Sequence, residues 1–149
     1  MAKRKSKYLT AVTLPLVEAV SEAYGEITSL GDEMQGWADN LEERFSHTSK
    51  YEAVREAADT LGQLEEPGSP DCLEAPKGAL AGETITFQRN SRPKQSRADR
   101  ASGAAAILRE AIERLDELAS RETIPQDYRD ELERQVDELE SVEFPGMCG

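Results

Sequence analysis

The sequence is short of the residues on which most metal and nucleophilic sites depend. Its 149 residues include one histidine and two cysteines. Cys72 and Cys148 are far apart, with no C-x-x-C spacing, so neither a zinc site nor any other metal or cofactor is expected. His47 falls in a predicted turn without a serine or cysteine partner pattern, and we expect it to be solvated.

Catalytic and nucleotide-binding motifs are missing as well. The chain contains no G-x-S-x-G, Walker, G-x-G-x-x-G, H-E-x-x-H or EF-hand pattern. Carboxylates are so plentiful that an acidic pair such as Glu110 and Glu113 indicates solvation rather than acid–base chemistry. We therefore expect a protein that is not an enzyme.

Long apolar runs are also missing. No stretch approaches the ~18 apolar residues of a membrane-spanning helix. The basic start "MAKRKSK" is not followed by the apolar segment that a secretion signal requires. The sequence predicts a cytoplasmic protein with reduced thiols and no membrane partner.

Charge, by contrast, is abundant and unevenly distributed. Thirty acidic side chains outnumber 18 basic ones, for a formal net charge of −12. By segment, residues 1–7 carry +4, residues 8–88 carry −12, residues 89–100 carry +4 and residues 101–149 carry −8. An acidic surface repels phosphates, so direct nucleic-acid binding is not expected. The charge suits solubility, a basic protein partner or mimicry of nucleic acid.

Heptad spacing predicts a long first helix over residues 14–45, with Thr13 as its cap. Apolar residues recur in steps of three and four, as in a coiled-coil seam. The seam is longer than the other helices of one chain need, which favours a homo-oligomer. Its residues are Leu16, Val20, Ala23, Ile27, Leu30, Met34, Trp37, Leu41 and Phe45.

Three shorter helices are predicted by their apolar stripes and by capping residues. The second runs over residues 50–64 with Ser49 in a capping box, and it ends before the turn "EEPGSPD". The third begins after Ser96 as its cap. The fourth begins at "TIPQ", where Thr123 fits a capping box.

One segment, "ETITFQR" at residues 83–89, has the alternation of a strand, with Ile85 and Phe87 on one side. A single strand needs a partner, because an unpaired edge is unstable. The weak candidate "KGALAG" and a second subunit are the two sources of a partner strand that we consider.

The predicted fold class is mainly α: two helical hairpins, the first with the long helix, and one short β element between them, in a homo-oligomer. We expect one domain overall. Its segments are a basic flexible N-terminus over 1–13, a helical hairpin over 14–65, a loop with a short strand and a basic segment over 66–97, and a second helical hairpin with a C-terminal tail over 98–149.

The best candidate binding site is a basic segment in this acidic chain. Residues 84–101, "TITFQRNSRPKQSRADRA", hold five cations and one acid. Arg97 and Arg100 fall in the first turn of the third helix, where the dipole disfavours cations but N–H groups favour anions. Phe87 offers a ring for a base. We expect a phosphate-bearing small ligand, and the predicted ligand-binding residues are Phe87, Arg89, Asn90, Arg92, Arg97 and Arg100.

Two alternative roles of the basic segment stay open. In the first, Arg97 and Arg100 pair with the protein's own surplus carboxylates, within one chain or across a dimer. In the second, the segment contacts RNA or DNA.

The segments "MQGWADN", "KYEAVREAADTL", "SRADRASGAAAIL" and "VEFPGM" resemble a family of small acidic proteins encoded by bacteriophages and prophages. The similarity covers most of the chain after residue 18. It implies a phage accessory protein in the host cytoplasm, of a kind often made to counter host defence. With the basic segment, it predicts a protein that sequesters a nucleotide immune signal.

Two rival functions also stay open. Carboxylates of the last two helices would allow the protein to imitate nucleic acid and to block a host nuclease or restriction enzyme, so that its partner is a host defence protein. The long seam alone would suit a structural or assembly factor.

Overall fold

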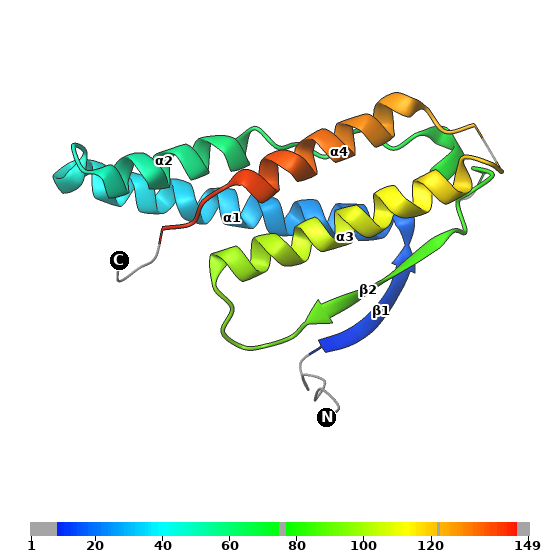
Figure 1. The fold of residues 1–149 in the computed structure, drawn as a ribbon, viewed down its shortest axis with the longest axis horizontal. Helices are drawn as coiled ribbons and strands as arrows, with labels where there is room; N and C mark the ends of the chain where they lie inside the picture. The colour runs from blue at the N-terminus through cyan, green and yellow to red at the C-terminus, as the bar shows by residue number, and fades with distance from the viewer. Residues whose placement is uncertain (1–8, 75–76, 122, 146–149) are drawn as a thin grey trace.

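A computed structural model describes residues 9–74, 77–121 and 123–145, and its described part is mainly helical, as predicted (Figure 1). Two helical hairpins, α1–α2 and α3–α4, pack together, and a two-stranded antiparallel sheet lies along one side of α3. The elements are β1 (Leu9–Pro15), α1 (Leu16–Phe45), α2 (Ser49–Gly62), the 3-10 turn η1 (Asp71–Leu73), β2 (Thr84–Asn90), α3 (Arg97–Leu118) and α4 (Gln126–Ser141).

Strand β1 corrects two of the predictions. Residues 9–13, predicted to belong to a flexible N-terminus, instead pair with β2, while residues 1–8 lie outside the described residues. The partner of β2 within the chain is therefore β1 and not "KGALAG", and no second subunit is needed to supply it. The strand is hard to recognise in the sequence because it passes into α1 at Pro15 without a turn, so Leu14 also fits the start of the helical seam.

The helix starts confirm one predicted cap and correct three. The Ser96 hydroxyl accepts a hydrogen bond from the N–H three residues on, at 3.0 Å. At α2, Thr48 rather than Ser49 supplies the capping oxygen. Thr13 lies in β1, where its hydroxyl is 2.8 Å from that of Thr86. Helix α4 begins after a proline with no side-chain cap, and Thr123 lies outside it.

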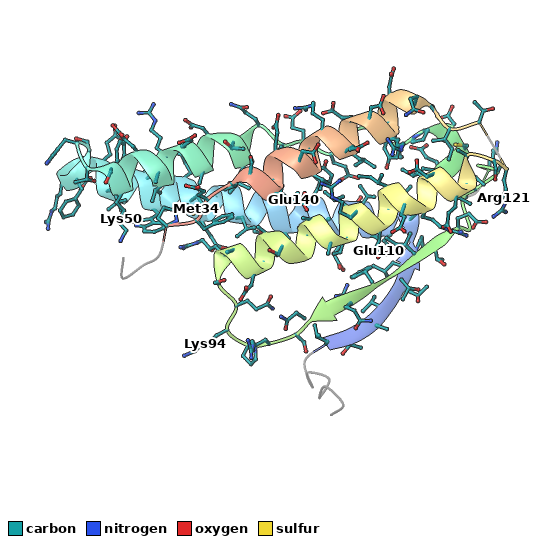
Figure 2. All side chains as sticks on the ribbon, in the orientation of Figure 1. Met34, Lys50, Lys94, Glu110, Arg121 and Glu140 are labelled. Carbon is teal, nitrogen blue, oxygen red and sulfur yellow. The ribbon has the colours of Figure 1, made fainter. Side chains whose placement is uncertain are left out.

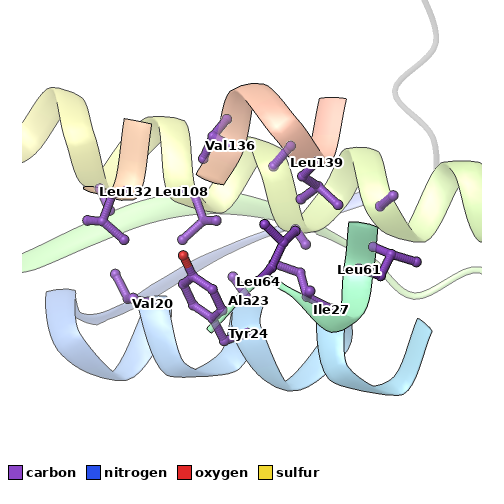
Figure 3. Close-up of a cluster of buried hydrophobic side chains, with 14 of the residues drawn as sticks. Val20, Ala23, Tyr24, Ile27, Leu61, Leu64, Leu108, Leu132, Val136 and Leu139 are labelled. Carbon is purple, nitrogen blue, oxygen red and sulfur yellow. The ribbon is translucent and has the colours of Figure 1, made fainter. Parts of the chain in front are cut away.

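The other helices of the same chain cover most of the apolar seam of α1. Each seam residue from Leu16 to Met34 is at most 1% exposed. Figure 3 shows Val20 and Ile27 of α1 among apolar side chains of α2, α3 and α4. The seam therefore gives no support for a homo-oligomer over this part of α1, and the oligomeric state stays a prediction.

The last part of the seam is less covered. Helices α1 and α2 extend beyond α3 and α4 at one end of the molecule, where Figure 2 labels Met34 and Lys50. Trp37 and Leu41 are half-buried there, and Phe45 is 49% exposed. Charged side chains cover the outer faces of the helices (Figure 2).

One buried polar side chain ties α4 to α1. Gln135 is 2% exposed. Its amide oxygen accepts a hydrogen bond from the Tyr24 hydroxyl at 2.9 Å, and its amide nitrogen donates to the Glu65 carbonyl at 2.8 Å. Because both ends of the amide are satisfied, this polar group costs little to bury. Burial raises the pKa of the Tyr24 hydroxyl, which stays protonated.

The sheet positions the basic segment. Val12 and Leu14 of β1 stand opposite Phe87 and Ile85 of β2 and share the face that packs on the helices. Residues 91–96 then carry the chain from the end of β2 into α3. The arginines at the end of β2 and those at the start of α3 consequently lie near one another.

Candidate anion-binding groove

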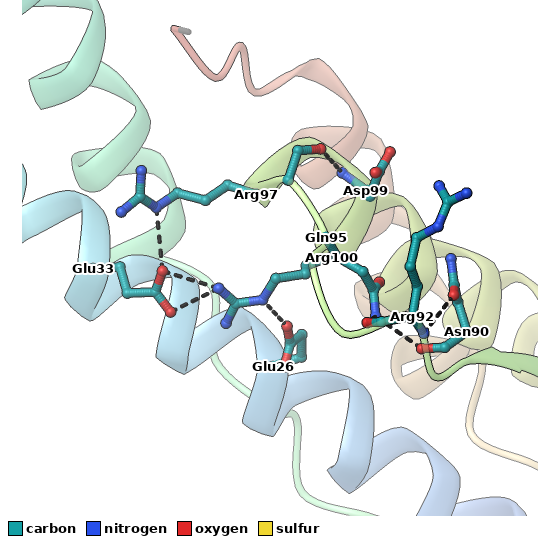
Figure 4. A network of polar contacts seen from close by, with 9 residues as sticks. Glu26, Glu33, Asn90, Arg92, Gln95, Arg97, Asp99 and Arg100 are labelled. Atoms are coloured by element: carbon teal, nitrogen blue, oxygen red, sulfur yellow. Dashed lines mark hydrogen bonds and ion pairs between the residues drawn. The ribbon is translucent and has the colours of Figure 1, made fainter. Parts of the chain in front are cut away.

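Local hydrogen bonds fix the turn between β2 and α3 (Figure 4). The Asn90 side-chain oxygen accepts from the backbone N–H of Arg92 at 3.0 Å. The Gln95 amide donates to the carbonyl of Asn90 at 2.8 Å and to that of Arg92 at 3.2 Å. Asn90, predicted as a ligand-binding residue, thus has a clear role in shaping the turn.

Arginines of the basic segment form ion pairs with one face of α1. Nη1 of Arg100 lies 2.8 Å from a carboxylate oxygen of Glu33, and its Nε bonds to Glu26. Nε of Arg97 lies 3.2 Å from Glu33 (Figure 4). A further pair joins Arg89 of β2 to α1, at Glu22. Pairing with the protein's own carboxylates, which stayed open on sequence grounds, occurs here within one chain.

The pKa of the Glu33 carboxyl lies below its ordinary value. Burial alone would raise this pKa, but the hydrogen bonds and positive charges of Arg100 and Arg97 lower it further than burial raises it. Burial acts to lower the pKa of Arg100, and its bonds to Glu26 and Glu33 outweigh that effect and raise it. Glu33 and Arg100 are therefore ionised near neutral pH.

A groove of about 880 Å³ lies beside these ion pairs, between β2, residues 91–96, α1 and the first half of α3. Its apolar lining includes Leu9 and Ile107. Five of the six predicted ligand-binding residues line it, and these are Phe87, Arg89, Asn90, Arg92 and Arg100.

Arg97 is not among the residues that line the groove. Its guanidinium carbon lies 5.3 Å from the centre of the Trp37 ring, and its Nε points to Glu33. The two arginines predicted to act as one site therefore differ, since Arg100 borders the groove and Arg97 packs toward the projecting end of α1.

Phe87 forms a covered part of the groove wall. The residue is 4% exposed, and the Arg89 guanidinium carbon lies 5.7 Å from its ring centre. The prediction that its ring stacks on a base is thus corrected, because burial between the sheet and the helices leaves little ring surface for a ligand.

Charges within the groove balance. Arg89, Arg92 and Arg100 supply cations, and the lining also contains Glu22, Glu26 and Asp99. An anion that enters must compete with the two glutamates for the guanidinium groups. Sequence reasoning missed these glutamates, because a spacing of four places both on one face of a helix but does not show that this face meets the basic segment.

The acidic face of α4 is the surface that would imitate nucleic acid in the alternative function. Arginines form ion pairs with several of its carboxylates. Arg109 of α3 contacts Asp137 at 2.8 Å. Arg134 contacts Glu131 at 2.5 Å and Glu138 at 2.7 Å. These pairs neutralise part of the charge on which mimicry would depend.

Other site types find no support among the described residues. Over residues 9–74, 77–121 and 123–145, no group of His, Cys, Asp and Glu side chains is arranged to hold a metal ion. In the same part of the chain, no helix has the length and apolar character needed to cross a membrane.

Comparisons with protein-family models, with curated proteins and with solved structures found no match to this chain. The resemblance to phage-encoded acidic proteins therefore stays a prediction.

Proposed function

We propose that the protein is a non-enzymatic, phage-type accessory factor, acting in counter-defence, that captures a phosphate-bearing ligand such as a nucleotide immune signal. The observation that carries this proposal is the groove of about 880 Å³ and its lining, which includes five of the six residues selected from the sequence. Its volume falls within the range of about 300–1,000 Å³ typical of small-molecule sites.

The chemistry of the lining suits a phosphate group. Guanidinium groups form charge-assisted, often paired hydrogen bonds with phosphate oxygens. Each guanidinium has about five N–H donors, and the ion pairs of Arg89 and Arg100 use one nitrogen and two nitrogens, respectively. N–H groups therefore remain on both residues for a phosphate that approaches from the groove.

Glu22 and Glu26 keep the two arginines in place and also oppose an anion. A phosphate with two negative charges has the advantage over a single carboxylate, because its attraction to each guanidinium is larger. This competition predicts selectivity for multiply charged phosphates over monoanions such as acetate.

We further propose that the protein is a homo-oligomer. Because the chain's own helices cover the α1 seam from Leu16 to Met34, the interface lies elsewhere on the molecule.

A thermal-shift screen of the wild-type protein with nucleotides and cyclic nucleotides tests the ligand proposal. A ligand at about 100 times its dissociation constant adds about 2.7 kcal/mol to the free energy of unfolding. Inorganic phosphate and acetate serve as the multiply and singly charged controls. No shift with any phosphate compound would contradict the proposal.

A further inference from the structure

Strand β1 has β2 on one side and, among the described residues, no strand on the other. The Leu16 N–H donates to the Glu83 carbonyl at 3.0 Å. Because hydrogen-bonded pairs alternate along an antiparallel ladder, Val12 and Leu14 direct their backbone groups to β2. Ala11 and Thr13 consequently direct theirs to the open side. Figure 1 shows β1 as the outer strand of the sheet, away from the helices.

This open edge carries no charge. Strand β1 lies within residues 8–17, the longest run without a charged side chain in a protein of net charge −12. Exposed edges are usually protected by lysines or by central prolines, and β1 has only Pro15, at its end. Leu9, at its other end, is 47% exposed.

We propose that two copies of the protein join through β1 into one continuous four-stranded antiparallel sheet, around a two-fold axis at Val12. In this register Val12 stands opposite the partner's Val12. Ala11 and the partner's Thr13 exchange N–H···O=C bonds, as do Thr13 and the partner's Ala11. Each copy offers the same edge to the other, as a two-fold interface requires.

Charge favours a second copy as the occupant of this edge. Two chains of net charge −12 repel one another, so contact between them is least costly where charged side chains are absent. A basic partner protein would be drawn instead to the acidic outer faces of the helices. The inference rests on the homo-oligomer of the proposed function and not on its ligand.

The first test compares Ala11→Lys with Gln88→Lys by sedimentation at micromolar concentrations without nucleotide. Ala11 and Gln88 are exposed register partners on one face of the sheet, but Ala11 belongs to β1, whose edge forms the proposed interface, and Gln88 belongs to β2. The wild type and Gln88→Lys are expected to sediment at twice 16.5 kDa. Ala11→Lys is expected to raise the dimer dissociation constant about tenfold or more. A monomeric wild type, or an unaffected Ala11→Lys dimer, would overturn the proposal.

The second test does not depend on a charged substitution in the strand. Thr13→Cys, in a Cys72→Ser and Cys148→Ser background, is treated with a short bismaleimide. Thr13 lies on the exposed face of the sheet, and the register places the two copies of this residue about 7–8 Å apart, as diagonal neighbours, so a cross-linked dimer is expected. Thr86→Cys is the matched control, because Thr86 is the exposed register partner of Thr13 and the two β2 strands would lie about 14 Å apart or more in the joined sheet. A dimer that Thr13→Cys fails to link, or that both variants link equally, contradicts the β1 interface.

The β1 dimer and the ligand in the groove are tested independently, so either proposal can be wrong without the other. Absence of a dimer leaves the groove and its nucleotide screen untouched. Absence of a ligand leaves the sedimentation and cross-linking results as they are.

Discussion

Of the arginines that pair with carboxylates, two sets invite comparison, because only one of them borders the groove. Arg89 and Arg100 reach α1 from β2 and α3, whereas Arg109 and Arg129 reach carboxylates of α3 and α4 on the outer face. Side-chain exposure does not separate the sets, since Arg100 is 23% and Arg129 25% exposed. Ion pairing is therefore no sign of a site here. The distinguishing feature is the turn at residues 91–96, which opens a groove beside one set.

The largest effect is expected from removing the core that holds both sets in place. Leu30 is fully buried in α1. Leu30→Asp buries an unpaired charge, which should lower the free energy of unfolding by more than about 4 kcal/mol. Circular dichroism and thermal melting should show loss of the fold. Ser29→Asp, at an exposed position of the same helix, is the control and should melt like the wild type.

A smaller difference should separate the ion pairs that join α3 to α1 from the exposed ion pairs within α4. Arg97→Ala with Arg100→Ala leaves Glu26 and Glu33 without partners in a partly buried place, and should cost about 1–2 kcal/mol. Arg134→Ala removes pairs within α4, where Arg134 is 52% exposed, and should cost less, because water screens exposed ion pairs. Urea unfolding measures both. Equal costs would contradict a special role for the pairs that join α3 to α1.

The sequence was sufficient for the parts of the fold that repeat. The period of three and four residues identified the four α-helices of the described residues, because each helix buries one stripe over several turns. Ser96 as the cap of α3 was also predictable, since capping depends on neighbouring residues alone. Strand β1 was missed because only its pairing with β2, far away in the sequence, distinguishes "LTAVTLP" from a helix start.

The site was predictable in part for the same reason. Five residues that line the groove are local to one segment, so their charge pattern was visible. Glu22, Glu26 and Glu33 come from α1, and no local signal tells that this face of α1 meets the end of β2 and the start of α3. The covered position of Phe87 likewise depends on which face of the sheet the helices pack against.

A fall in pH should weaken the ion pairs of both sets of arginines. The pKa values of Glu33 and Asp116 are lowered in the folded state, in each case with burial acting in the opposite direction to the arginine contacts. A lowered pKa means that the folded protein binds fewer protons than the unfolded chain, so stability is lost as pH falls. The contribution of Glu33 should be fully present above its unfolded value of 4.5 and should decline below it.

Melting temperatures measured between about pH 6 and pH 3 test this expectation. Arg97→Ala with Arg100→Ala should make the curve less steep, because Glu33 loses the contacts that lower its pKa. An unchanged slope would show that these contacts do not stabilise the folded state.

The smallest effect is expected on the acidic face of α4. Glu131→Gln with Glu138→Gln removes the partners of Arg134, at a distance from the groove lining. Nucleotide affinity should then change by less than about twofold, or ~0.4 kcal/mol. A steeply salt-dependent complex with a basic nucleic-acid-binding protein, lost in this variant, would instead favour the mimicry alternative.

The central claim is that Arg89 and Arg100 hold a phosphate in the groove, and calorimetric titration with the best nucleotide of the screen tests it most directly. Each charge-assisted contact contributes about 1.5–3 kcal/mol, so Arg89→Ala with Arg100→Ala should weaken binding at least ~100-fold. Arg134→Ala should bind like the wild type. Glu22→Gln with Glu26→Gln should bind more tightly, because the competing carboxylates are gone. Equal affinities in the wild type and the Arg89–Arg100 double variant would contradict the account.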